Sequence, residues 1–357
     1  MGLPNVTIEF KTTAAASIAR SQKGTVGLIL RDANAAAQGK AYIIRSTADI
    51  PKELDTANAL YITRALIGYV NPPKSVRVFV LPGDATDLTD GFAYFATVEV
   101  DYLCGPHNCT STEASAIATW VKSRRAEHYI VKAVLPETTA DSEGVINVTA
   151  EGVVIGSDTL AAAALCSRIA GLIAGTPMTI SCTYAPLYEV TDITRLSRED
   201  MNAAIDAGKF ILYHDGEKVK VARGINSLVT TTQDKGAAFK KIKIVEAVDM
   251  IQHDIRRVCE DSYIGKYANS YDNKCLLITA IQGYFSGLET AGILDPGKSS
   301  VAIDLTAQAN YLEAQGTDTS TMSEQEIKEA NTGDKVFITC SVKILDAIED
   351  IAIGVTL

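Results

Sequence analysis

Val76-Arg-Val-Phe-Val-Leu81 is a short apolar run that is typical of a buried β-strand. Three comparable runs occur in the N-terminal part of the chain, at Gly27–Leu30, Tyr102–Cys104 and Tyr129–Leu135. Segments with helical character separate the runs, such as Ala114–Arg125, which follows a Thr110-x-x-Glu113 capping box. Short strands that alternate with helices predict an α/β fold.

A predicted hairpin marks the end of this α/β body. It pairs Phe210–Tyr213 with Val219–Ala222 across Asp215-Gly216, a dipeptide that favours a tight turn. Beyond residue 232 the pattern changes, because Val245 to Val258 carry apolar residues at helical spacing and Leu276–Leu288 suggests a second helix. The remaining expected elements are a strand at Val301–Leu305, a short helix at Ser323–Ala330 and a strand at Val336–Ile344. We therefore expect an α/β domain at 23–232 and an α+β C-terminal domain at 233–345.

Both ends of the chain have the alternation of a strand with one buried face. Val6, Ile8 and Phe10 alternate with polar residues, and Ile351, Ile353, Val355 and Leu357 alternate with small ones. A strand at a chain end needs a partner sheet to hold it. Residues 1–22 and 346–357 are therefore expected to be extended arms.

The composition is that of a globular protein of about two domains. The 357 residues are 47% hydrophobic and 21% charged, with a formal charge of -10 that disfavours nucleic acid and anionic membranes as partners. We expect no secretory signal and no membrane insertion, because Leu160–Gly175 is too short and is interrupted by Arg168. Synthesis in the cytoplasm is expected, and the seven cysteines then fit reduced thiols.

Gly292-Ile-Leu-Asp-Pro-Gly-Lys-Ser299 matches the spelling of a phosphate-binding P-loop. A working P-loop follows a strand and opens a helix, whereas this segment follows a predicted helix and precedes a predicted strand. We interpret Gly292 as a helix cap and the following residues as a turn. A nucleotide-binding α/β enzyme that uses Gly292–Ser299 remains the alternative reading.

Cys104-x-x-His107-x-Cys109 gathers three residues that can bind zinc, but no second cluster lies nearby to complete a site. The chain has four histidines, and none lies in a recognisable catalytic motif. These motifs offer no persuasive catalytic constellation, and we assign no catalytic residues, no metal and no cofactor from them. The expectation that the chain is not an enzyme rests on the resemblance described below.

Lys235, Lys240, Lys241 and Lys243 form a basic cluster in an acidic chain. Such a cluster is either a solvated face or a docking surface for an acidic partner.

Several segments together resemble the sheath protein of contractile phage tails and phage-tail-like bacteriocins, in the short branch found in Gram-positive bacteria and their prophages. The resemblance extends over nearly the whole chain, and its combination of segments is specific. They are Ile169-Ala-Gly-Leu-Ile-Ala-Gly-Thr-Pro177, Ser181-Cys-Thr-Tyr184, Arg223-Gly-Ile-Asn-Ser-Leu228, Tyr263-Ile-Gly-Lys266, Tyr271-Asp-Asn-Lys274, Asn331-Thr-Gly-Asp-Lys-Val-Phe337 and Asp346-Ala-Ile-Glu-Asp350.

The resemblance implies a subtilisin-like but non-proteolytic α/β body, an α+β C-terminal domain and two strand-forming arms. It implies polymerisation as stacked hexameric rings around a tail tube, with baseplate and terminator or collar proteins as further partners. Contraction would drive the tube through a target cell envelope, and the particle, a phage tail or an R-type bacteriocin, would leave the bacterial cytoplasm on lysis. The apolar arm residues would mediate strand exchange between subunits. The four lysines are then candidates for contact with the tube.

Overall fold

The computed structural model describes residues 24–356, which form two compact units. The first, which we call the body, contains residues 24–250 and 346–356, and the second, the C-terminal unit, contains residues 251–345. The division falls inside one helix, α6 (Ile242–Val258). The two compact units therefore meet after residue 250, later in the chain than the domain boundary expected at residue 232. That domain boundary stays a prediction.

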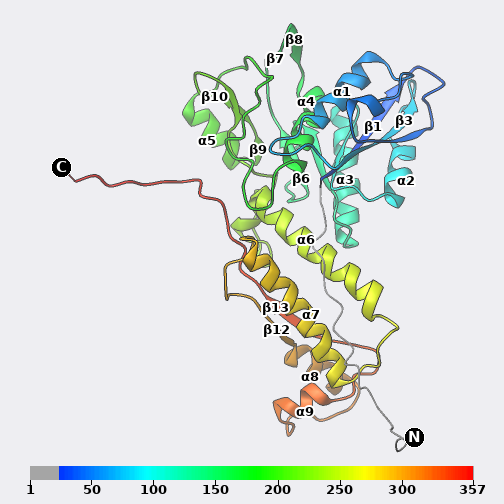
Figure 1. Cartoon of the computed structure of the whole chain (residues 1–357), viewed down its shortest axis with the longest axis vertical. Coiled ribbons are helices and arrows are strands. Elements are labelled where there is room, and N and C mark those ends of the chain that lie inside the picture. The colour runs from blue at the N-terminus through cyan, green and yellow to red at the C-terminus, as the bar shows by residue number, and fades with distance from the viewer. Residues whose placement is uncertain (1–23, 357) are drawn as a thin grey trace, which may run out of the picture. The chain divides into compact units, whose positions relative to one another are not determined.

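The centre of the body is a seven-stranded sheet with the order β2-β3-β1-β4-β5-β6-β9 (Figure 1). All neighbouring strands are parallel except β2 and β3. Val26 of β1 pairs with Val76 of β3 on one side and with Tyr102 of β4 on the other. The strands are β1 (Thr25–Asp32), β2 (Ala41–Ile44), β3 (Ser75–Pro82), β4 (Tyr102–Cys104), β5 (Lys132–Pro136), β6 (Val145–Val148) and β9 (Lys209–Phe210).

Helices cover both faces of this sheet. Successive side chains of a strand point to opposite faces, so they enter two separate cores. Leu28 packs in the core that α1 and α4 close, whereas Ile29 packs in the core under α2 and α3. The α/β fold expected from the strand and helix pattern is confirmed. The body helices are α1 (Thr56–Leu66), α2 (Thr89–Thr97), α3 (Ser111–Ala126), α4 (Ala162–Ala174) and α5 (Arg198–Asp206).

Two small hairpins complete the body. The hairpin expected around Asp215-Gly216 is present as β10 (Leu212–His214) and β11 (Val219–Val221), in which His214 pairs with Val219. Its loop has four residues, 215–218, and is therefore longer than a two-residue turn. The other hairpin joins β7 (Val153–Ile155) to β8 (Asp158–Leu160).

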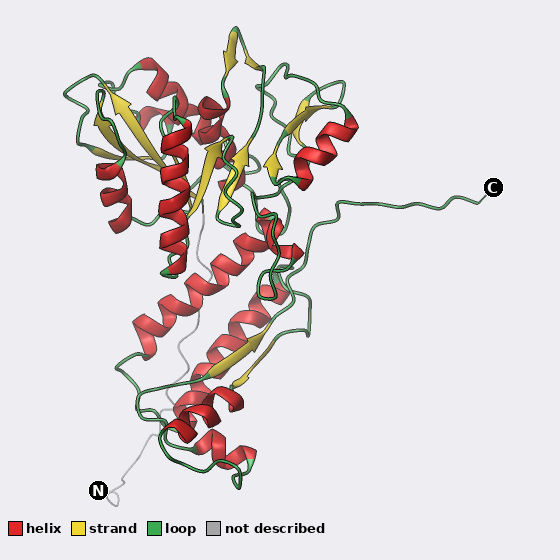
Figure 2. Ribbon diagram, turned by 180° about the vertical axis from the view of Figure 1, so that it is seen from behind, coloured by secondary structure: helices red, strands yellow, loops and turns green. Residues whose placement is uncertain are grey.

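The C-terminal unit combines helices with a two-stranded antiparallel sheet (Figure 2). One expectation here is wrong, because the strand predicted at Val301–Leu305 ends at Ile303 and Leu305 begins a helix. Asp304 ends the strand, because its side chain accepts a hydrogen bond from the Ala307 N–H and caps that helix. The elements are α7 (Tyr271–Thr290), β12 (Ser300–Ile303), α8 (Leu305–Ala314), α9 (Glu324–Glu329) and β13 (Ile338–Ser341).

Over residues 24–356, no helix has both the length and the apolar character that a bilayer span requires.

Candidate functional site

The C-terminal segment is extended and exposed, and it pairs with no strand among the described residues. Ile351, Ile353 and Val355 are 74%, 80% and 79% exposed. Burying apolar surface is worth about 25 cal/mol per Å². These three side chains therefore provide a driving force for association. The strand predicted here does not form within the chain, because β-structure needs a second strand. Leu357, Val6, Ile8 and Phe10 lie outside the described residues.

The residues just before this segment are held on the body. The Glu349 carboxylate lies 2.6 Å from the Thr183 hydroxyl, 3.1 Å from Nε of Arg223 and 3.2 Å from Nζ of Lys241. Burial raises the pKa of Glu349, but the Thr183 hydrogen bond and the Lys241 charge outweigh it and hold the pKa below its usual value. The exposed segment thus begins at a fixed point on the body.

The two-stranded sheet of the C-terminal unit has unpaired edges among the described residues. In β13, Thr339, Cys340 and Ser341 are exposed, and Ala302 of β12 pairs with Thr339 on the inner side. A free edge presents backbone N–H and C=O groups that an added strand can use. This edge is a candidate receiver for an extended arm.

The four candidate tube-contact lysines have different surroundings. Lys235 pairs with Glu143 at 2.7 Å, and Lys241 pairs with Asp346 as well as with Glu349. Lys243 is only 7% exposed, and burial lowers its pKa. Lys243 thus offers little surface for a contact with the tube, and its assignment to that contact stays a prediction. Lys240 is half-buried, and no ion pair forms on it within residues 24–356.

The P-loop spelling at Gly292–Ser299 lies between the end of α7 and the start of β12, which confirms the expected helix, turn and strand order. The Ser299 N–H and hydroxyl donate to the carboxylate of Glu289, which lies at the end of α7. The hydrogen bond from the Ser299 side chain and that from the Gly297 backbone hold the pKa of Glu289 below its usual value. The chain's own carboxylate thus occupies the donors that a phosphate would need.

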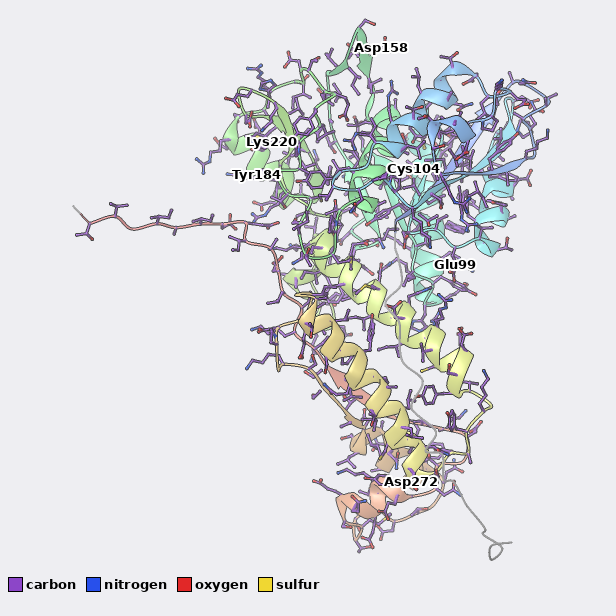
Figure 3. The ribbon with its side chains drawn as sticks, viewed as in Figure 1. Glu99, Cys104, Asp158, Tyr184, Lys220 and Asp272 are labelled. Atoms are coloured by element: carbon purple, nitrogen blue, oxygen red, sulfur yellow. The ribbon has the colours of Figure 1, made fainter. Side chains whose placement is uncertain are left out.

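The Cys104, His107 and Cys109 side chains do not converge into a metal site. Cys104 is buried at the end of β4 inside the body, whereas His107 packs edge-on against Tyr61 (Figure 3). Burial raises the pKa of Cys109 to about 12, which opposes formation of the thiolate that binds metals. Between residues 24 and 356, no group of three or more His, Cys, Asp or Glu residues is placed to hold a metal ion.

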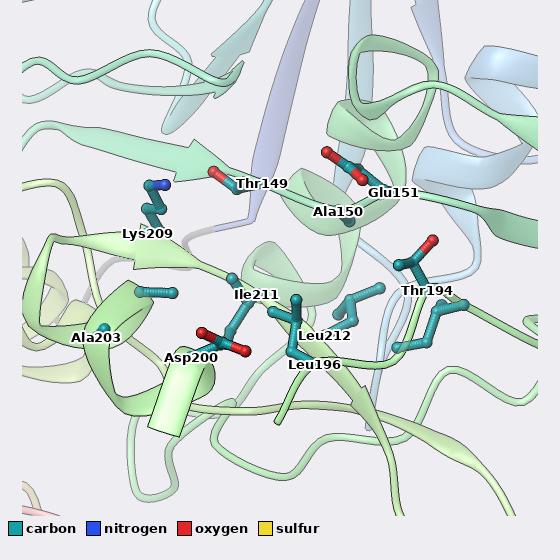
Figure 4. Close-up of a pocket in the computed structure, with 12 residues that line it drawn as sticks. Thr149, Ala150, Glu151, Thr194, Leu196, Asp200, Ala203, Lys209, Ile211 and Leu212 are labelled. Atoms are coloured by element: carbon teal, nitrogen blue, oxygen red, sulfur yellow. The ribbon is translucent and has the colours of Figure 1, made fainter. Parts of the chain in front are cut away.

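A cavity of about 410 Å³ lies beside the edge strand β9 and α5 (Figure 4). Its lining includes Glu151, Asp200 and Lys209 together with apolar side chains such as Ile211. Glu151 and Asp200 are exposed, so water screens their charges. This arrangement favours no particular chemistry.

Single-residue reasoning missed the contact around Glu349. All its members except Lys241 lie in three segments quoted above for the family resemblance, 181–184, 223–228 and 346–350. Their joint occurrence was therefore the available signal, although only the fold reveals that they meet.

Comparisons with known proteins agree on one family. Residues 83–227 match the model of the phage tail sheath protein central domain, and residues 234–357 match that of the phage tail sheath C-terminal domain. The chain is 40% identical to the tail sheath protein of Clostridium phage phiCD119 over 363 aligned residues, which cover 99% of each chain. It is 30% identical to the phage-like element PBSX protein XkdK of Bacillus subtilis, over 48% of this chain and 38% of that protein.

Solved structures show the same fold at low identity. The crystal structure of a sheath tail protein from Desulfitobacterium hafniense matches with a TM-score of 0.72 and 18% identity, over 84% of this chain and 94% of that one. The cryo-EM structure of the anti-feeding prophage helical sheath in its contracted state matches with a TM-score of 0.73 and 17% identity, over 100% of this chain and 99% of that one.

Proposed function

The chain belongs to the phage tail sheath protein family, and from this premise we propose that its subunits stack as hexameric rings around a tail tube and contract to drive the tube through a cell envelope. The chain is a structural subunit of a contractile tail sheath. The likeness to a contracted helical sheath supports the helical assembly. The observation that carries the proposal is the exposed apolar segment at 351–356, because such a segment gains stability only in an assembly.

Neighbouring subunits are linked by strand addition in this proposal. Ile351, Ile353, Val355 and Leu357 of one subunit, and Val6, Ile8 and Phe10 of another, extend the sheet of β12 and β13 in a neighbour. Backbone hydrogen bonds along the free edge supply affinity, and the period-two alternation sets the register. The exposed edge of β13 and the unpaired C-terminal segment support this arrangement.

Contraction in this proposal is powered by assembly and uses no nucleotide. The extended sheath is metastable, and each body moves outward and buries more surface between subunits when the baseplate triggers it. The arms keep the lattice connected during this movement. The tail tube, the baseplate and a terminator or collar protein are the remaining partners. Assembly takes place in the bacterial cytoplasm, and lysis releases the particle.

Removing the arm should separate folding from assembly. We expect a chain without residues 351–357 to fold but to form no sheath tubes, because residues 351–356 are exposed and lie outside both cores. Electron microscopy of concentrated protein measures tube formation, and circular dichroism checks the fold. Long tubes from the truncated chain would refute strand exchange by this arm.

A matched pair of substitutions tests the alternation itself. Ile353→Lys should prevent tubes, whereas Ala352→Lys, on the opposite face of the added strand, should retain them.

A further inference from the structure

We propose that Ser181, Thr183, Arg223 and Lys241 form a carboxylate-binding socket that holds Glu349 and fastens the C-terminal arm to the body. The inference rests on the proposed exchange of that arm between subunits. Beyond that exchange, it identifies the residues that fasten the arm and the unit, the body, on which a force along the arm acts.

The socket surrounds both oxygens of the Glu349 carboxylate. Oε1 lies 2.6 Å from Oγ1 of Thr183 and 3.2 Å from Oγ of Ser181. Oε2 lies 3.1 Å from Nε of Arg223 and 3.2 Å from Nζ of Lys241. Two hydroxyls and two cations thus converge on one carboxylate, and hydrogen bonds to charged groups are stronger than those between neutral ones.

The position of Glu349 differs from that of its neighbours along the chain. Its side chain is 6% exposed, whereas the residue before it, Ile348, is 87% exposed and the side chain of Asp350 is 86% exposed. Asp350 nevertheless contacts the same Arg223 at 2.6 Å through Nη2. Glu349 is thus the most buried of three acidic side chains that contact the body here, since Asp346 pairs with Lys241 and Asp350 with Arg223, which is the arrangement of an anchor.

Backbone hydrogen bonds of the body hold the hydroxyl groups of the socket in place. The Thr183 N–H donates to Oγ of Ser181 at 3.1 Å, and the Gly224 N–H donates to Oγ1 of Thr183 at 2.9 Å. A Cβ at Gly224 would lie 2.8 Å from Sγ of Cys182, so only glycine lets the two segments approach this closely. Oγ1 of Thr183 thus accepts from the Gly224 N–H and donates its own proton to Glu349.

Tyr184, the residue after Thr183, has an unusual backbone conformation. Its φ is 59°, which a residue with a side chain adopts rarely, and its N–H donates to the Val221 carbonyl at 2.9 Å. Its ring packs against Tyr213 on the exposed side of the body, in the same region as Lys220 (Figure 3). Strain of this kind persists where the surrounding structure and function require it.

The anchor has a mechanical consequence. Residues 346–356 belong to the body, although they follow the C-terminal unit in the sequence. A pull on an arm bound to a neighbour therefore acts on the body at Glu349. Without the Glu349 contact, the same pull would act at Asp346, which pairs with Lys241. Once that pair broke, it would act at Leu345, through four more residues that extend to roughly 14 Å. The socket thus shortens the link between subunits.

Proteolysis of the unassembled full-length subunit tests the socket directly. Endoproteinase Glu-C cleaves after glutamate, and cleavage after Glu349 releases an octapeptide, residues 350–357, which mass spectrometry detects. Cleavage after Glu217 in the exposed hairpin loop of the same molecule provides the internal reference. We expect release of the octapeptide, relative to cleavage at Glu217, to rise about tenfold or more in the Arg223→Gln/Lys241→Gln variant.

Arg195→Gln is the matched control, because Arg195 is an exposed body arginine that pairs with Asp192 and not with the arm. It should release the octapeptide at the wild-type rate. If the double variant does not fold by circular dichroism, Ser181→Ala removes one hydroxyl donor and should still accelerate release. Equal release from wild type and a folded socket variant would overturn the socket.

Assembly provides the second measurement. Glu349→Ala should still form tubes, but with weaker layer lines in their diffraction patterns, because the longer link tolerates more variation between subunits. Tubes as ordered as wild type would overturn the mechanical role of the anchor. Tube formation by the chain without residues 351–357 would instead refute arm exchange itself, so the two failures are distinguishable.

Discussion

At the scale of single residues, a buried charge cluster attaches the first half of α6 to the sheet of the body. Nζ of Lys132 lies 2.9 Å from the Asp249 carboxylate and 2.8 Å from that of Glu246. Nη1 and Nη2 of Arg125 donate to the Asp249 carboxylate at 3.0 and 2.9 Å. The Lys132 and Asp249 side chains are each 1% exposed. Burial alone would lower the pKa of Lys132, but the Asp249 and Glu246 charges outweigh it and hold the pKa above its usual value.

Removing one member of this cluster should strongly destabilise the body. Asp249→Ala removes the carboxylate that Lys132 and Arg125 share and leaves them only Glu246 and Glu143, so the cost should approach, without exceeding, the value of about 3–5 kcal/mol for a fully uncompensated buried charge. Urea unfolding followed by fluorescence of Trp120, the single tryptophan, which stacks on Phe92 in the body, measures the effect. Asp206→Ala at the exposed end of α5 is the control, and equal shifts for both variants would show that the cluster contributes nothing.

Local signals were predictable from sequence at this scale, whereas long-range pairings were not. The Thr110 and Glu113 capping box is present as predicted, because both partners lie within one helical turn. The Lys132 and Asp249 pair joins residues 117 positions apart, and nothing in either local pattern indicates it. Lys243 is buried in the body together with Ile242 and Ile244, and the alternation of lysine and isoleucine in the sequence does not indicate this, because adjacent residues of a helix point in different directions.

At the scale of elements, the edge of β13 has a defined hydrogen-bonding polarity. The Asp304 N–H donates to the Phe337 carbonyl at 3.0 Å, so the backbone groups of Phe337 point toward β12. Successive residues of a strand direct their backbone groups to opposite sides. The backbone groups of Thr339 therefore face β12, and those of Cys340 face outward, toward the side where a strand can be added.

Proline at Cys340 should block strand addition and leave the subunit folded. Cys340→Pro removes an outward N–H, a change that edge strands tolerate because no internal bond is lost. Cys340→Ser keeps the N–H and is the matched control. We expect tubes from the serine variant and none from the proline variant by electron microscopy. Normal tubes from Cys340→Pro would exclude this edge as the receiver.

Element types were more predictable than element ends. The helices expected from apolar spacing between Val245 and Val258 and at Leu276–Leu288 are present within α6 and α7. The helix α8 was not predicted, because its apolar residues do not form a clear stripe in the sequence. The extended C-terminal segment has its alternation in the sequence, but the partner that we propose for it belongs to another molecule, so the sequence of one chain does not identify that partner.

At the scale of the whole molecule, the net charge of the subunit matters most in the sheath, where it is repeated. The formal charge of -10 is repeated in every copy of a sheath, so local positive groups carry more weight there than in an isolated protein. Lys240 is the member of the lysine cluster that keeps a half-exposed position without an ion pair inside residues 24–356. The proposed contact with acidic groups of the tube therefore rests mainly on Lys240.

Reversing this charge should affect extended particles more than the sheath itself. Lys240→Glu is expected to leave polymerisation intact but to lower the yield of extended, tube-filled particles, because each ionic contact is weak and its effect accumulates over the lattice. Negative-stain counts of extended and contracted particles measure the effect, with Lys52→Glu, an exposed lysine of the body, as the control. Unchanged yields in the Lys240 variant would remove this lysine from the contact.

The exposed C-terminal segment also carries a hazard for a subunit that has not yet been assembled. Ile351-Ala-Ile-Gly-Val-Thr356 has no charge and no proline, a composition that favours cross-β fibrils. Acidic residues precede it at Asp346, Glu349 and Asp350, and charges that flank such a segment act as gatekeepers against aggregation. The same six residues that we propose to join neighbouring subunits in a sheath would also pair unassembled subunits in an amyloid fibril. Rapid capture at a growing end is therefore a condition for keeping the subunit usable.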